Sequence, residues 1–588
     1  MKKLLIVIVI AIAIAAGIYF FKGGKVGGLS LSGGSLPSEN AVLEYVPADT
    51  VFFAGSVEPL DFAKTLEMSS KMGFDYSAMM GAGFDDLKSE LGNAPDAAKV
   101  LVSIYGDYLK AVKNKSVKEL GLRSELNMAV YTVGVLPVIR LELDGTDAFS
   151  KAIAKIEADQ GVTATVNTVN GVEYREYSLD DGTEEVPMSL VIATHDNQAI
   201  VTVNTELDDA KDLQRTLSEK PTTNILDGGV LNELASDNGY LGYSIFLLDN
   251  LAIVDGITKP SANAFGKSLQ EVLDAYGAGN DMKDIQTPAC NTELTGLTQN
   301  WPMLSAGYTE FDDSNASYKM VLKGNNADLL ETLGKLRGHI SDNVSNDDFA
   351  MSFGIGLDMD QMVPVITTVW ESLTKEDFSC PPLAEMQAGL RQSNPMMLGM
   401  MSGMVAGIKG VGFSVVDVNE DALSNVERNP MAFMQDGQFM VTVTAEKPQN
   451  LLQSLGMYAP ELAQMKLEDG GEPQVLPAGV GAETKIALRG HDLVLMMGQT
   501  DELIGKVESN GSLEKNGLMT FSMDFKKYMG LLEEMMDSAA ENARGSEKEM
   551  LEEQKEVFSE LKKADGIVKG KFDITDEGIV TSSSYQAK

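Results

Sequence analysis

Residues 129–155 read AVYTVGVLPVIRLELDGTDAFSKAIAK, and the fold can be worked out from this stretch because variants of it recur along the chain. The segments 129–133 and 138–143 are rich in β-branched and aromatic residues, which is typical of strands. Between them, Gly134–Pro137 interrupts the run with residues that favour a turn. The stretch therefore begins with a predicted β-hairpin.

The second part of the stretch predicts a helix. Asp144 or Thr146 is expected to cap it, because a side-chain oxygen at this position accepts hydrogen bonds from the first unpaired N–H groups. Phe149, Ile153 and Ile156 follow at the spacing of one apolar helical face. The unit is thus a strand, a turn, a second strand and a helix.

Three kinds of unit recur along the sequence. The hairpin–helix unit returns at 305–336 and 411–457, and the hairpin alone at 566–586. An apolar strand, an acidic residue and a helix follow one another at 51–68, 243–257, 351–370 and 519–536. A hairpin with His-Asp at its turn precedes a helix at 190–213 and 485–507. Because the units recur in the same order, we expect an α+β fold of two diverged halves, with antiparallel sheets and helices packed on them.

The chain divides by composition into four segments. Residues 1–22 are expected to form a signal anchor, that is, a transmembrane helix, and the Gly/Ser-rich residues 23–39 a flexible linker. Residues 40–338 and 339–588 are the two predicted α+β halves.

The N-terminus carries the localisation signal. Leu4–Phe21 is an uninterrupted apolar run of bilayer length that follows Lys2 and Lys3, which favours an N-terminus on the inner side of the membrane. A cleaved secretory signal is the alternative, but Ile18–Phe21 extend the apolar run past the small residues where cleavage would fall. We expect an anchor in the inner membrane with the bulk in the periplasm, or secretion to the periplasm after cleavage.

The charge balance excludes several functions. The 588 residues hold 86 acidic and 47 basic side chains, a net charge of −39, so the surface repels phosphate backbones and nucleic-acid binding is not expected. Gly266-Lys267-Ser268 resembles the end of a phosphate-binding loop, but Ser261 stands where that loop needs a glycine. No nucleotide and no cofactor are expected.

Cys290 and Cys380 are the two cysteines of the chain. In an oxidising compartment such a pair predicts a disulfide, which would join the two predicted halves. Two buried thiols are the alternative.

His195-Asp196 and His491-Asp492 recur at the turns of related hairpins. They would form a pseudo-symmetric site if the halves brought them together, with the aspartates orienting the histidines or binding a metal. The alternative is ordinary turn chemistry, in which Asp bonds its own backbone and the histidine is solvated. No metal or catalytic motif accompanies them.

A dense methionine stretch forms a further candidate site, comprising Met396, Met397, Met400, Met401 and Met404. Methionine fills cores and adaptable apolar grooves, and its thioether also binds Cu(I). Core packing, a groove for a lipid or peptide, and a copper site are the three interpretations.

Two segments carry a resemblance to a known group of proteins: LEYVPADTVFFAGSVEPL at 43–60 and AVYTVGVLPVIRLELDGTDAFSKAIAKIEA at 129–158. The sequence resembles uncharacterised proteobacterial cell-envelope proteins in which a Pro-Ala-Asp-Thr segment leads into a strand after an export signal. The resemblance covers the first half better than the second. It implies a Gram-negative envelope location and carries no activity or site residues.

Taken together, these features predict a non-enzymatic, membrane-anchored periplasmic binding or scaffold protein. One alternative is a carrier of a hydrophobic ligand, lipid or peptide, in a methionine-lined groove. Another is a hydrolase whose site is assembled from scattered residues, with His195 or His491 as its best candidates.

Overall fold

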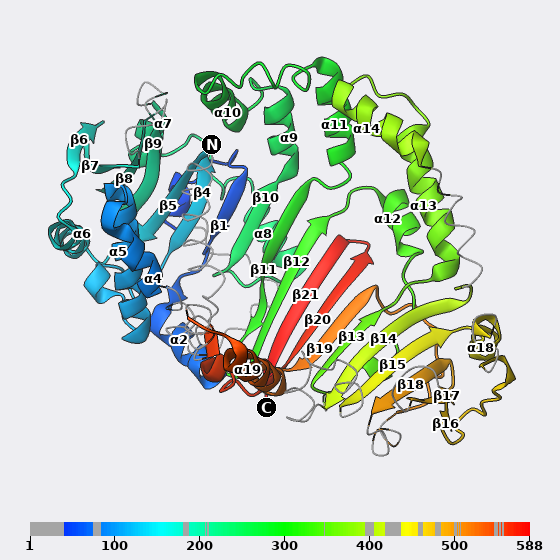
Figure 1. Cartoon of the computed structure of the whole chain (residues 1–588). Coiled ribbons are helices and arrows are strands. Elements are labelled where there is room, and N and C mark those ends of the chain that lie inside the picture. Colours follow the sequence, from blue (N-terminus) through cyan, green and yellow to red (C-terminus); the bar gives the residue numbers. More distant parts are fainter. Residues whose placement is uncertain are drawn as a thin grey trace. The chain divides into compact units, whose positions relative to one another are not determined.

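The computed structural model describes residues 40–588, with gaps at 75–80, 82–83, 180–186, 206, 208–210, 346, 348, 394, 396–404, 418–436, 457–461, 477–483, 499–502, 504, 506, 546–550, 552–553 and 556–557. The chain forms two compact units. Unit 1 contains residues up to Lys323 together with Ser379–Leu383, and unit 2 contains Gly324–Phe378 together with Ala384–Lys588. All strand ladders are antiparallel, and helices accompany the sheets, so the described chain is an α+β protein (Figure 1).

Unit 1 is built on a sheet whose strands follow the order β12-β11-β10-β1-β4-β5-β9-β8-β7-β6. Their bounds are β1 Phe52–Gly55, β4 Met128–Val133, β5 Leu136–Glu142, β6 Thr165–Val169, β7 Val172–Ser178, β8 Met188–His195, β9 Gln198–Thr205, β10 Ile245–Asp249, β11 Met303–Phe311 and β12 Asn315–Lys323. A separate short ladder joins β2 Leu60–Asp61 to β3 Glu125–Leu126.

The helices of unit 1 are α2 Phe62–Lys71, α4 Phe84–Ser89, α5 Asp96–Lys113, α6 Thr146–Gln160, α7 Lys211–Leu217, α8 Val230–Asn238, α9 Asn250–Thr258, α10 Ala264–Ala275 and α11 Pro288–Thr298. The sheet is covered on both faces. Phe53 and Tyr131 pack on one face with α7, α8 and the segment before β1. Ala54 and Val130 pack on the other face with α2 and α5.

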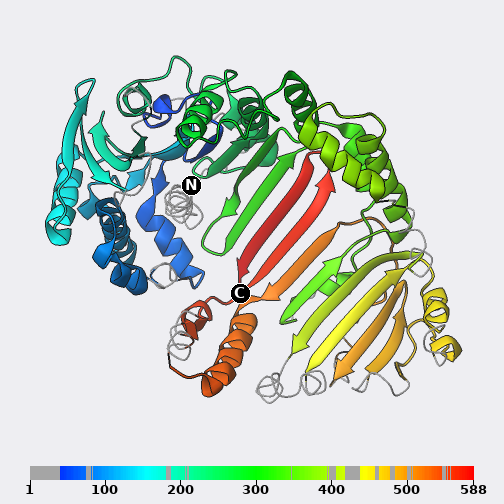
Figure 2. The same ribbon diagram turned by 45° about the horizontal axis from the view of Figure 1, so that its top comes forward.

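Unit 2 carries a sheet of order β21-β20-β19-β13-β14-β15-β18-β17-β16. The strands are β13 Met351–Ile355, β14 Ile408–Asp417, β15 Gln438–Ala445, β16 Gln474–Val475, β17 Thr484–Arg489, β18 Asp492–Gly498, β19 Met519–Asp524, β20 Gly566–Thr575 and β21 Gly578–Ala587. The helices are α12 Ala327–Gly334, α13 Met359–Thr374, α18 Pro448–Leu455 and α19 Phe525–Asn542, together with α14 Pro381–Gln392, whose first three residues belong to unit 1. Figure 2 shows these strands side by side, with α19 near the ends of β19 and β20.

The two strand orders match at nine positions. Reading each sheet from its last strand in sequence, β12 corresponds to β21, β1 to β13, β4 to β14, β5 to β15 and β9 to β18. Among the described residues, β6 in the sheet of unit 1 and the separate β2–β3 ladder have no counterpart in unit 2. The chain therefore adds the matching strands to the sheet in the same order in both units.

Residues 129–155 have the predicted order of strand, turn, strand and helix. They form β4, a turn at Gly134 with φ of 60°, then β5 and α6. Ile153 and Ile156 are buried on the predicted helical face. The predicted cap is wrong: Gly145 is the N-cap residue, and neither Asp144 nor Thr146 bonds to the first turn. The tight connection places a glycine, with φ of 94°, where a side chain was expected.

The strand–acid–helix units are confirmed as N-capping units. Asp61, Asp249, Asp358 and Asp524 stand at the N-caps of α2, α9, α13 and α19, and each side chain accepts a backbone N–H of the first turn. An aspartate at this place satisfies an otherwise unpaired donor and opposes the positive end of the helix dipole. An aspartate thus starts a helix four times, and in three of them, Asp61, Asp249 and Asp524, it is also the last residue of a strand.

The predicted transmembrane helix at 1–22 and the linker at 23–39 lie outside the described residues. Within the described part of the chain, no helix combines the length and apolar character needed to span a bilayer.

Candidate functional site

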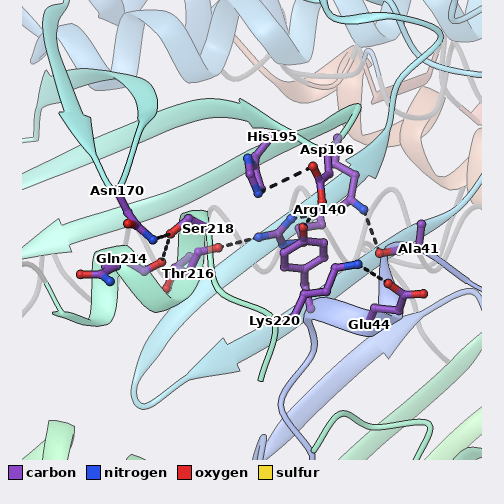
Figure 3. Close-up of polar contacts among 12 residues, drawn as sticks. Ala41, Glu44, Arg140, Asn170, His195, Asp196, Gln214, Thr216, Ser218 and Lys220 are labelled. Atoms are coloured by element: carbon purple, nitrogen blue, oxygen red, sulfur yellow. Dashed lines mark hydrogen bonds and ion pairs between the residues drawn. The ribbon is translucent and has the colours of Figure 1, made fainter. Parts of the chain in front are cut away.

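Arg140 on β5 is a fully buried cation. Its Nε donates to the Tyr131 hydroxyl at 3.0 Å and its Nη1 to Gln198 Oε1 at 2.7 Å. Its Nη2 donates to the carbonyl of Thr216 at 2.7 Å (Figure 3). The ring of Tyr45 lies 3.8 Å from the guanidinium carbon. A buried charge is costly unless its donors are satisfied, and here three neutral acceptors and an aromatic face surround it.

Arg140 belongs to a polar network that holds residues 40–46, the segment before β1. Gln198, which binds Arg140, also donates to the carbonyl of Ala41 at 2.8 Å. The Tyr45 hydroxyl donates to the Asp196 carboxylate, and Lys220 pairs with Glu44 at 2.5 Å (Figure 3). The bond from Tyr45 lowers the pKa of Asp196, while burial raises the pKa of Tyr45. The network therefore ties the start of unit 1 to β5 and β9.

In unit 2 the corresponding segment is residues 340–344, the segment before β13. It is held by an anion, Asp492, where unit 1 uses the cation Arg140. Asp492, the first residue of β18, is fully buried, as Gln198 is at the start of β9. Its carboxylate accepts from Thr444 Oγ1 at 2.6 Å, from Asn510 Nδ2 at 3.0 Å and from the Ser341 hydroxyl. In both units this buried polar residue anchors a neighbouring segment, which is an architectural role.

The predicted equivalence of the two His-Asp turns is wrong by two residues. In unit 1, His195 is the last residue of β8 and pairs with Gln198 across the turn Asp196-Asn197. In unit 2, Arg489 occupies that position, and His491 lies within the turn itself. The His-Asp pair therefore occupies different positions in the two hairpins: His195 precedes the two-residue turn, whereas His491 is the second residue of the turn.

The rings of His195 and His491 each lie beside one polar group. The Nε2 atom of His195 lies 3.8 Å from the Asp196 carboxylate, and its ring meets the Tyr45 ring edge-on. His491 Nδ1 lies 3.3 Å from the carbonyl of Ala445. No group of three or more metal-binding side chains occurs among the described residues. The hydrolase alternative therefore stays a hypothesis.

Cys290 and Cys380 form the predicted disulfide, with their Cα atoms 4.5 Å apart. Both sulfurs are buried. Glu293 on α11 also accepts the backbone N–H groups of Ser379 and Cys380, at 2.8 and 3.0 Å. The bond holds Ser379–Leu383 within unit 1, although the chain on either side of that segment belongs to unit 2.

The methionine stretch containing Met396, Met397, Met400, Met401 and Met404 lies outside the described residues, so its three interpretations stay predictions.

A different apolar surface appears on unit 2. Three neighbouring strands, β19, β13 and β14, present large apolar side chains on one side of the sheet, which we call the open face: Met519, Phe521, Met523, Met351, Phe353, Ile355, Val411 and Phe413. Phe521, Phe353 and Phe413 lie directly opposite one another across the three strands, and so do Met519, Ile355 and Val411. Ile355 is 39% exposed, Val411 43%, Phe413 36%, Met519 37% and Phe521 39%. Contiguous exposed apolar side chains of this size mark interaction surfaces.

The opposite side of the same strands is buried and carries small residues. Ser352 and Ser414 are fully buried and Ser522 is 5% exposed. Gly354 and Gly412 lie beneath the segment before β13, where an added Cβ would come within 2.6 Å of Ile340 and 2.2 Å of Val344 respectively. The small residues let this segment lie close against the sheet. On the other side, the open face, Met351 and the buried Val415 pack with Leu531 of α19. The rows through Phe353 and Ile355 are the part of the large apolar face that the described residues leave partly exposed.

The equivalent face of unit 1 is covered. Asp249 and Asp524 end corresponding strands, and counting back three residues equates Phe246 with Phe521. Phe246, Ala54 and Val130 lie opposite one another across β10, β1 and β4, as Phe521, Phe353 and Phe413 do across β19, β13 and β14. The register therefore equates Ala54 with Phe353 and Val130 with Phe413. Ala54 is 5% and Val130 3% exposed, because α2 and α5 lie on them.

Sequence reasoning missed the open face, although a signal was present. The strands read MSFGI at 351–355, VGFSV at 411–415 and MTFSM at 519–523, each alternating a large apolar residue with a small one. Alternation of this kind ordinarily predicts that the apolar side is the buried one. In unit 2 the structure buries the other side.

At one end of the open face lies an acidic cluster. Lys409, two residues before Val411 on β14, contacts the carboxylates of Asp358, Asp360 and Glu446 at 2.8, 2.8 and 2.9 Å. The hydrogen bond from Lys409 lowers the pKa of Asp360, and the three carboxylates raise the pKa of Lys409 despite its burial. One cation among three anions leaves this end of the face negative.

Comparisons with protein-family models, with curated proteins and with solved structures gave no match to this sequence.

Proposed function

We propose that this protein is a non-enzymatic binding or scaffold protein of the cell envelope and that the open face of unit 2 is its binding surface. The observation that carries the proposal is the contrast at equivalent positions. Val130 is 3% exposed under α2 and α5, whereas Phe413 is 36% exposed. Unit 1 covers this sheet face with its own helices. In unit 2 the equivalent face is available to another molecule.

The free energy of folding favours this interpretation of the open face. Each large apolar side chain left in water forgoes part of the roughly 1.5–3 kcal/mol that full burial provides. On the buried side, the hydroxyls of Ser352 and Ser414 have no hydrogen-bond partner among the described residues, which costs about 1 kcal/mol or more for each. Folding stability alone would place these side chains the other way round, so binding is the better explanation.

We further propose that the protein is anchored in the inner membrane through Leu4–Phe21, with its bulk in the periplasm. The buried disulfide between Cys290 and Cys380 supports an oxidising compartment. Protease added to intact spheroplasts should cleave the protein while it remains with the membranes. A protein fully protected from that protease would contradict the periplasmic location.

The two units are best explained as diverged copies of one ancestral unit. The matching strand orders, the aspartate caps of α9 and α19 and the buried polar residue at the start of β9 and β18 support this origin. On this view, unit 1 kept helices over the shared face, while unit 2 acquired phenylalanines there.

Binding of a neutral apolar dye, Nile red, tests whether the open face accepts an apolar molecule. The full-length protein is compared with a Phe413→Ser/Phe521→Ser variant. The matched control is Val475→Ser, because Val475 is also an exposed apolar residue of unit 2 but lies on β16, away from the open face. We expect dye binding to fall by about tenfold in the double variant only, since aromatic anchors dominate apolar sites. Equal binding by all three proteins would contradict the proposed surface.

A hydrophobic-ligand carrier is the second candidate, and the methionines Met351, Met519 and Met523 on the open face favour it. Native mass spectrometry of the full-length protein would then show a bound lipid mass that is lost on denaturation and absent from the double variant.

A further inference from the structure

We propose that the occupant of the open face is an amphipathic helix with a basic polar side, supplied by a partner protein. The proposal rests on the function proposed above and specifies the chemistry of the partner. Three independent features lead to it: the way unit 1 covers the same face, the dimensions of the exposed rows, and the charge around them.

Unit 1 shows which element fits this sheet face. There, Phe62 and Leu66 of α2 and Tyr108 and Val112 of α5 pack on the strands. The rings of Phe62 and Tyr108 meet edge-on with centroids 6.2 Å apart. The strand order and the antiparallel pairing are shared by unit 2, so a helix with a similar apolar stripe fits the open face.

The dimensions of the open face match a short helix. The row from Phe521 through Phe353 to Phe413 crosses two strand spacings, about 10 Å, which is the diameter of a helix with its side chains. Along β19, Met519 to Met523 extends about 13 Å, a distance that roughly nine helical residues span. Two to three helical turns would therefore cover the exposed side chains.

The charge of the surroundings selects a basic partner. The Lys409 cluster at the Val411 end has three carboxylates for one ammonium group, and the side chain of Glu446 is 53% exposed. The whole chain carries a net charge of −39. A basic helix is attracted to such a surface, whereas an anionic lipid headgroup or a second copy of this acidic chain is repelled.

The experiment measures fluorescence anisotropy of labelled 18-residue peptides added to the full-length protein in phosphatidylcholine nanodiscs, with empty nanodiscs as the blank. Three peptides are used: a leucine/lysine peptide with its leucines on one helical face, a scrambled peptide of the same composition, and a leucine/glutamate peptide with the amphipathic pattern. The protein variants are Phe413→Ser/Phe521→Ser, the milder Ile355→Thr/Val411→Thr, and the control Val475→Ser.

We expect the amphipathic lysine peptide to bind, and to bind about tenfold more weakly to either open-face variant, because central apolar anchors carry most of the affinity. Val475→Ser should bind it like the wild type. The scrambled and glutamate peptides should bind at least about tenfold more weakly than the lysine peptide, and added salt should weaken the lysine peptide further. Circular dichroism of each variant verifies that its fold is retained.

Several outcomes would overturn the inference. Equal binding of the scrambled peptide would show that no helical face is recognised. Nile red binding without peptide binding would leave the open face as a binding surface but refute a helical occupant. A dimer that is lost in the open-face variants would identify a second copy as the occupant, and a co-purified lipid lost in those variants would identify a lipid. If neither dye nor peptide bound, the proposed function itself would fail.

Discussion

In unit 1, the side chain of Val130 is buried beneath α2 and α5, whereas Phe413, at the same place in the sheet of unit 2, is one-third exposed. The strand order around the two residues is the same. What differs is how fully the chain covers this face: unit 1 packs α2 and α5 on it, whereas in unit 2 the described residues leave Val411 and Phe413 partly exposed and press the segment before β13 onto the opposite face of serine and glycine. The comparison teaches that one topology supports either a closed core or an exposed binding surface, depending on the side chains it carries.

The largest expected effect concerns the disulfide, which only unit 1 contains. Replacing both Cys290 and Cys380 by serine should lower the stability of the protein by about 4 kcal/mol, because the bond closes a loop of 90 residues in the unfolded chain. Hydrogen exchange followed by mass spectrometry should show faster exchange in β10 and β11, with β17 and β18 unchanged. Equal acceleration in both sets of strands would remove this distinction between the units.

The buried charges offer the next test. Arg140→Met should destabilise unit 1 by about 3 kcal/mol, since it leaves Gln198 and Tyr131 without their buried partner. Arg123→Met is the control, because that arginine is half exposed and pairs with Glu142 at the surface, so its loss should cost less than about 1 kcal/mol. Denaturant titrations of the two variants measure the difference, and similar losses would show that the buried network is not what holds the segment 40–46.

The shared sheet face is compared directly by one substitution at equivalent positions. Val130→Ser should cost about 2 kcal/mol, because it removes buried apolar groups and adds a hydroxyl to a core. Phe413→Ser should cost about 1 kcal/mol or less, because its ring is partly in water. Exchange rates in β4 and β14 report the two effects. If Phe413→Ser were as damaging as Val130→Ser, the open face would be part of the core of unit 2.

The smallest effect is a pH dependence confined to unit 1. The bond from Tyr45 lowers the pKa of Asp196, so its stabilisation is present above the ordinary Asp pKa of about 3.9 and is lost as the pH falls through the lowered value. Tyr45→Phe removes this contribution and should raise the pH at which β8 and β9 lose protection. The gap between wild type and variant should close at the lowest pH. Asp196→Asn is the control, since an amide does not titrate, and a gap that persisted there would assign the effect to another group.

Much of the architecture followed from local patterns. The hairpin–helix unit at 129–155 and the strand–aspartate–helix units were predicted from residue spacing, because strand alternation, N-capping and helical periodicity act over a few residues. The disulfide was predicted from the two cysteines and the expected oxidising compartment. The detail that failed was also local: Gly145, and not Asp144 or Thr146, begins α6, because a tight strand-to-helix connection needed a backbone with positive φ.

The candidate sites were harder to predict because they depend on contacts between distant residues. Arg140 reads as an ordinary strand residue, yet it is buried by Tyr45, Gln198 and Thr216, which are distant in sequence. The two His-Asp turns look equivalent in sequence and differ by two positions in register. A one-dimensional pattern indicates which neighbouring strands form a hairpin but not which distant strands pair, so it cannot place these groups.

The sequence by itself determined the secondary-structure units, their order and the acidic charge of this protein. It also determined that 351–355, 411–415 and 519–523 have one large apolar side and one small side. Only the tertiary structure decided which of these sides faces the protein. The physical reason is that Gly354 and Gly412 admit the close approach of Ile340 and Val344, and a sheet face covered so tightly leaves the phenylalanines on the other side in water.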